Sequence, residues 1–129
     1  MRRRTVLLAG ICATVACTSS RSLPPILAAG EIRLSVRNRD IGVVDDPQTI
    51  EQVISLANQY LDGWIVPLAG PPVAGMKLGF YFEGRLMADL GLGDDFLTRT
   101  HGNFYSRNIG AAEVQEFREA LGLANPQTQ

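Results

Sequence analysis

Apolar and polar residues alternate along several segments of the chain, which indicates half-buried β-strands. The alternation runs from Ile32 to Val36, from Met76 to Phe82 and from Leu86 to Leu92, with Glu83-Gly84-Arg85 between the last two. Because successive side chains of a strand point to opposite faces, this period of two predicts strands with one apolar face. We expect shorter strands at 64–68, 96–100 and 104–107.

Two other segments carry apolar residues at helical spacing. Asp46 and Pro47 favour a helix start, since aspartate caps the first turn and proline suits the first helical position. An apolar stripe follows along a helix of about four turns, formed by Ile50, Val53, Ile54, Ala57 and Leu61. The segment 111–121 is the second helix, with one apolar face made of Val114, Phe117 and Leu121.

These elements predict a single α+β domain at 31–124, in the order β-α-β-β-β-β-β-α. Two amphipathic helices and one amphipathic sheet bury each other's apolar surface when both helices cover the same face. We therefore expect an antiparallel β-sheet meander with two helices packed on one face. Residues 125–129 form a polar tail.

The hairpin around Glu83-Gly84 has two conceivable registers. A one-residue slip moves every side chain of a strand to the other face, so the apolar pattern selects between them. A three-residue loop pairs Phe82 with Leu86 and Phe80 with Ala88, which keeps the apolar positions together. We expect that loop rather than a two-residue turn.

The N-terminus has the composition of an export signal. Arg2–Arg4 are positively charged, and Thr5–Ala16 is uncharged and mostly apolar. A helix of that length rises about 18 Å, short of the roughly 30 Å hydrocarbon core, so we expect a cleaved signal at 1–16. Thr14-Val15-Ala16-Cys17 resembles a bacterial lipobox, although Thr14 stands where a large aliphatic residue is usual. Residues 1–20 thus resemble a lipoprotein-type export signal, which implies that Cys17 carries lipid.

Residues 17–30 follow as a tether or linker. Pro24-Pro25 favours an extended segment, and Ala28-Ala29-Gly30 lacks packing bulk. Two alternatives to lipid attachment stay open, because cleavage after Ala16 or after Gly30 would release a soluble periplasmic or secreted protein.

Removal of the signal changes the composition. The remaining chain keeps all 13 acidic residues but only nine of the 12 basic ones, a net charge of −4. That acidic balance argues against nucleic acid as a partner. Cys12 leaves with the signal and Cys17 lies at its boundary, which excludes a disulfide framework, a thiol nucleophile or a cysteine metal site within the domain.

The outer face of the sheet is the candidate recognition surface. Aromatic and arginine side chains on a rigid, exposed face are typical of recognition. The alternative is a solvated face whose polar side chains support one another, with Asp89 paired to an arginine. The residues expected there are Tyr81, Asp89, Arg99, Tyr105 and Arg107.

No motif indicates catalysis. His101 is the one histidine and precedes Gly102-Asn103, so we expect it in a hairpin turn. Asp94-Asp95 lacks the spacing of a calcium loop and is expected in a turn. The sequence has no phosphate loop, nucleophile elbow or zinc-type cluster. We therefore expect no catalytic residue, no metal and no cofactor, and a protein that is not an enzyme.

The sequence thus indicates an exported bacterial envelope protein, anchored to the membrane through an N-terminal lipid. Its expected role is a non-enzymatic binding or accessory module for an envelope macromolecule or a small ligand. The alternative is a soluble periplasmic inhibitor or ligand-binding module that uses the outer sheet face.

Overall fold

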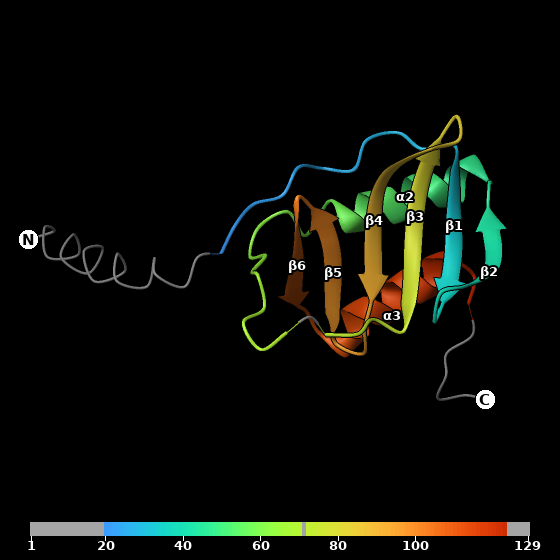
Figure 1. Cartoon of the computed structure of the whole chain (residues 1–129). Coiled ribbons are helices and arrows are strands. Elements are labelled where there is room, and N and C mark those ends of the chain that lie inside the picture. The colour runs from blue at the N-terminus through green and yellow to red at the C-terminus, as the bar shows by residue number, and fades with distance from the viewer. Residues whose placement is uncertain (1–19, 71, 124–129) are drawn as a thin grey trace, which may run out of the picture.

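The computed structural model describes residues 20–70 and 72–123, which form one antiparallel sheet covered by two helices. The sheet has six strands in the order β2-β1-β3-β4-β5-β6, and both helices lie on the same face of it (Figure 1). The predicted α+β fold is confirmed. In chain order the elements are β1 (Glu31–Val36), β2 (Arg39–Val44), α2 (Pro47–Ala57), β3 (Met76–Phe82), β4 (Arg85–Leu92), β5 (Phe96–His101), β6 (Asn103–Asn108) and α3 (Ala111–Ala120).

The element order differs from the prediction around the first helix. β2 follows β1 directly through a turn at Arg37 and Asn38, whose φ angles are 54° and 63°. The sequence pattern missed β2 because this edge strand is largely exposed and its turn has no glycine. The expected strand at 64–68 forms only isolated bridges instead, from Trp64 to Arg21 and from Ile65 to Ser106.

Both helices begin where the sequence predicts. At the start of α2, the Asp46 carboxylate accepts a hydrogen bond from the Thr49 backbone N–H at 2.9 Å, with Pro47 as the first helical residue. The helix ends at Ala57, earlier than expected, and the side chain of the C-cap residue Asn58 accepts from the Ile26 N–H and donates to the Ile26 carbonyl. The buried helix residues are those of the apolar stripes: Ile50, Val53 and Ala57 of α2, and Val114 and Phe117 of α3.

The β3–β4 hairpin has one feature of each of the two registers considered for it, that of a two-residue turn and that of a three-residue loop. Phe80 pairs with Ala88 as expected, but the turn is the two-residue Glu83-Gly84 turn, and Phe82 faces Arg85. A bulge at Met87 absorbs the one-residue difference. The expected three-residue loop is therefore wrong, because a β-bulge restores the apolar register that a short turn would otherwise disrupt.

Residues 21–30 do not form a free linker. The Leu23 and Ile26 side chains are only 4% and 3% exposed and belong to the hydrophobic core. Arg21 and Trp64 exchange two backbone hydrogen bonds of 2.7 and 3.0 Å. The expected domain start at Glu31 is wrong. The prolines indicated a linker, but tertiary packing buries the apolar residues on either side of them. The signal at 1–16, the first tether residues 17–19 and the tail at 125–129 lie outside the described residues.

Candidate functional site

The candidate recognition residues do not share one face of the sheet. Tyr81 and Asp89 lie on the outer face. Tyr81 pairs with Leu86 and Asp89 with Gly79, and these positions alternate with the buried positions of β3 and β4. Arg99, by contrast, lies two residues after Leu97, which pairs with Leu92 on the apolar face. Tyr105 stands opposite Arg99 and Arg107 opposite Leu97, so all three belong to the helix-covered face. The expectation of a joint outer-face site is therefore wrong for Arg99, Tyr105 and Arg107.

The pattern could not fix the orientation of β5, because Phe96 and Leu97 are adjacent apolar residues and either could point inward. The structure buries Leu97 fully and leaves Phe96 half-buried, with its ring lying where a Cβ on Gly93 would be. Tyr105 is consequently in the core. Arg107 supports the loop after α2, donating from Nε to the Asp62 carbonyl at 2.6 Å.

The two residues that do lie on the outer face are engaged within the sheet. The Arg33 guanidinium lies 3.9 Å from the centroid of the Tyr81 ring and forms an ion pair with Glu31. Asp89 accepts from the Thr100 backbone N–H at 2.8 Å and from its hydroxyl at 3.0 Å. Asp89 therefore bonds a threonine rather than the arginine expected under the alternative interpretation.

Asp89 marks a place where the sheet opens. The ladder between β4 and β5 contains only two residue pairs, Gly91–Thr98 and Leu92–Leu97. If that register continued for two more residues, Asp89 would lie opposite Thr100. There the Thr100 N–H donates to the Asp89 carboxylate instead of to a backbone carbonyl of β4. Beyond this point β4 bends away from β5 (Figure 1).

A cavity of about 140 Å³ lies at this opening. It is smaller than the roughly 300 Å³ at which pockets for drug-sized ligands begin, so it suits a small ligand or one chemical group. Its lining is apolar apart from three residues of β5. The residues that line it are Pro24, Pro25, Ile26, Leu27, Met87, Ala88, Arg99, Thr100 and His101.

Arg99 is the unusual residue of this cavity, because its side chain is only 5% exposed. One guanidinium nitrogen, Nη1, donates to the Pro24 carbonyl at 2.9 Å. Among the described residues, the buried Nε has no hydrogen-bond partner, and no carboxylate lies within ion-pair distance of Arg99. Burial lowers the pKa of Arg99 below its ordinary value, and the negative charge of Asp89 partly opposes that shift. The guanidinium still carries its charge at neutral pH.

His101, expected in a hairpin turn, lies in strand β5 at the edge of that turn. It ends β5 opposite Asn103, with Gly102 between them at a φ of 78°. Its exposed side chain also lines the Arg99 cavity. No local pattern predicts this proximity, since the cavity depends on Pro24–Leu27 packing against strands more than 55 residues away.

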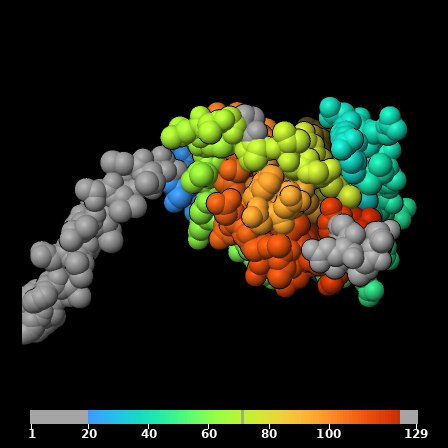
Figure 2. Space-filling view, turned by 90° about the horizontal axis from the view of Figure 1, so that it is seen from below, coloured from blue at the N-terminus to red at the C-terminus, as the bar shows by residue number. Residues whose placement is uncertain are grey.

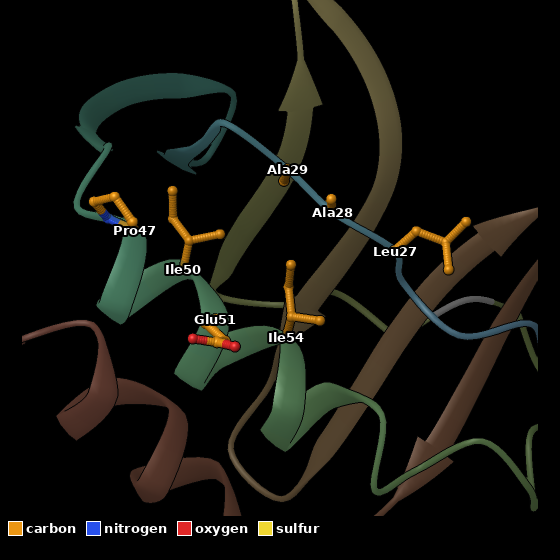
Figure 3. A pocket seen from close by; sticks show the side chains of 7 residues that line it. All are labelled: Leu27, Ala28, Ala29, Pro47, Ile50, Glu51 and Ile54. Carbon is orange, nitrogen blue, oxygen red and sulfur yellow. The ribbon is translucent and has the colours of Figure 1, made fainter.

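A second, larger cavity of about 310 Å³ lies between Ala28-Ala29 and helix α2 (Figure 3). Ile50 and Ile54 point from the helix toward the extended segment above it, and Glu51 is the one charged residue in the lining. A single carboxylate at the edge of an apolar groove provides few directional contacts. This cavity therefore has fewer polar groups to orient a ligand than the one at Arg99.

An exposed apolar loop adjoins the first described residues. Arg21 is bonded to Trp64, and the chain continues from Trp64 into a loop where Leu68 is 100% and Val73 89% exposed. From Gly63 to Met76 the sequence has no charged side chain. Figure 2 shows this loop beside the start of the described chain. Exposed apolar side chains form an interaction surface where they lie together in one contiguous patch.

No protein-family model matches this chain, no curated protein matches its sequence, and no solved structure matches its fold. Within residues 20–70 and 72–123, no helix is long and apolar enough to cross a membrane. The same part of the chain has no group of three or more His, Cys, Asp or Glu side chains that could hold a metal ion.

Proposed function

We propose that this chain is an exported, lipid-anchored module that binds its ligand or partner at the surface of a bacterial membrane and has no catalytic role. The observation that carries the proposal is the packing of residues 21–30. Cleavage after Gly30 would remove Leu23 and Ile26 from the core. Losing a buried Leu or Ile side chain costs about 2–5 kcal/mol, against a total stability of about 5–15 kcal/mol for a typical domain.

This cost disfavours one of the two alternative cleavage sites and favours processing before Arg21. Lipid attachment at Cys17 and ordinary cleavage after Ala16 both meet that condition, because both keep residues 21–30. Of the two, lipid attachment uses the Cys17 thiol, which the lipobox resemblance marks as the lipid acceptor. Four residues of extended chain reach at most about 14 Å from Cys17 to Arg21. A lipid on Cys17 would therefore hold the domain directly against the membrane.

The exposed apolar side chains of residues 65–70 and 72–73 support the same arrangement. The fully exposed Leu68 follows closely after Trp64, the residue bonded to Arg21. Membrane attachment by one lipid is strengthened when a second element contacts the bilayer, and apolar side chains near the attachment point provide one.

Labelling with radioactive palmitate tests the anchor. We expect the full chain to incorporate label when expressed in a bacterial host, and Cys17→Ser to abolish incorporation and release the protein from the membrane fraction. Cys12→Ser is the matched control and should stay labelled, because Cys12 belongs to the signal. An unlabelled wild-type protein, or a mature N-terminus at Glu31, would contradict the proposal.

A further inference from the structure

The cavity at the β4–β5 opening contains a buried positive charge that has no negative partner within residues 20–70 and 72–123. Arg99 has one hydrogen bond, to Pro24, and its Nε has none among the described residues. Burying an ionised group that is incompletely hydrogen-bonded costs free energy. A hydrocarbon side chain would fill the same space without that cost, so packing alone does not account for an arginine here.

We propose that the Arg99 cavity is a binding site for a small organic monoanion of the carboxylate class. A carboxylate would supply the counter-charge that Arg99 lacks and accept from the guanidinium, whose planar donors match two carboxylate oxygens. This site deepens the proposed binding role and rests on it. Anchoring is tested separately, because palmitate labelling does not involve Arg99.

Charge and size favour a monoanion over a phosphate or a larger polyanion. Arg99 is the one side chain of the lining that is permanently charged, and the carboxylate of Asp89 opposes anions from the neighbouring strand position. A cavity of about 140 Å³ also leaves little room for a strongly hydrated dianion.

The rest of the lining favours an apolar body on the ligand. The cavity wall also contains the hydrocarbon of Pro24, Pro25, Leu27 and Met87. Leu27 and Met87 are themselves exposed, so a short alkyl chain bound there would cover apolar surface that now faces water.

Thermal unfolding of the full chain tests the site with butyrate, at constant ionic strength maintained with sodium chloride. Butyramide is the neutral control of matched size. We expect butyrate to raise the melting temperature in a saturable way, because a ligand bound only by the folded state stabilises it. Butyramide and chloride should leave the melting temperature unchanged. Equal responses to butyrate and butyramide would overturn the proposal, as would no response to butyrate.

Three variants assign the effect to Arg99. Arg99→Met should fold and lose the response to butyrate, whereas Arg118→Met, on helix α3, should keep it. Arg99→Lys keeps the charge but loses the paired donors, so about tenfold more butyrate should be needed for half-saturation, the equivalent of one charge-assisted hydrogen bond. An undiminished response in Arg99→Met, or in Arg99→Lys if the Met variant does not fold, would refute the assignment.

Discussion

Single polar residues stabilise this domain where they satisfy backbone groups that the secondary structure leaves open. Asp46 caps helix α2 through the Thr49 N–H and also accepts from the Thr49 hydroxyl at 2.8 Å. These two hydrogen bonds hold the pKa of Asp46 below its ordinary value of 3.8. A carboxyl group whose pKa is lower in the folded state stabilises that state only while it is ionised.

Acid titration should therefore reveal the Asp46 cap. Its stabilisation is complete above the unfolded-state pKa, near pH 4, and is lost as the pH falls through the lower pKa of the folded state. We expect wild type to lose stability relative to Asp46→Asn when both are melted between pH 6 and about pH 2. The asparagine variant is the control, because its side-chain oxygen can still cap the helix without titrating. A constant difference across this range would contradict the assignment.

Among the elements, two of the hairpins, β1–β2 and β3–β4, have turns with positive φ at both central residues. In the β3–β4 turn Glu83 has a φ of 51° and Gly84 a φ of 81°. Such turns match the twist of the flanking strands, and asparagine followed by glycine fits them best. Glutamate at the first position is strained, since a side chain other than that of Asn or Asp rarely adopts this conformation.

Two substitutions in this turn should have opposite effects. Glu83→Asn should raise the free energy of unfolding by about 0.5 kcal/mol, because asparagine tolerates the left-handed conformation. Gly84→Ala should lower it by about 1 kcal/mol, since a Cβ is disfavoured at positive φ although nothing lies within 4 Å of that position. Urea denaturation measures both values. Effects of the same sign would exclude the turn strain described here.

At the scale of the whole molecule, the N-terminal segment joins parts of the chain that are distant in sequence. Arg21 bonds Trp64, Leu23 donates to the Leu61 carbonyl, and Pro24 accepts from Arg99 of β5. The same segment thus covers the core, forms one wall of the Arg99 cavity and brings residue 21 beside the exposed loop. Anchoring through Cys17 would fix the orientation of the domain as well as its location.

A fluorescent probe on the loop tests that orientation. In lipidated protein reconstituted into phosphatidylethanolamine–phosphatidylglycerol vesicles, an NBD group on Leu68→Cys should be shielded from aqueous iodide. The same group on Glu83→Cys, in the β3–β4 turn away from this loop (Figure 1), should be quenched freely. Burying one exposed leucine in lipid is worth about 1.5–3 kcal/mol, enough to favour one orientation. Equal quenching at the two positions would contradict the membrane-facing loop.

Features that depend on local periodicity could be predicted from the amino-acid sequence. The Asp46-Pro47 helix start, the apolar stripes of α2 and α3 and the alternation in β3 and β4 each follow from neighbouring residues, so they could be predicted together with the fold class. The export signal and the lipid on Cys17 stay predictions, since residues 1–19 lie outside the described part of the chain.

The face that each strand buries, and the segment that completes the core, depend on long-range packing. The adjacent apolar pair Phe96-Leu97 fits either face, and pairing of Leu97 with Leu92 made the choice that moved Arg99 and Tyr105 inward. Leu23 and Ile26 lie in a proline-rich segment whose composition indicates a linker, yet they are buried. The physical reason is the same in both cases: the contacts join residues far apart in the chain, and a local pattern contains no record of such partners.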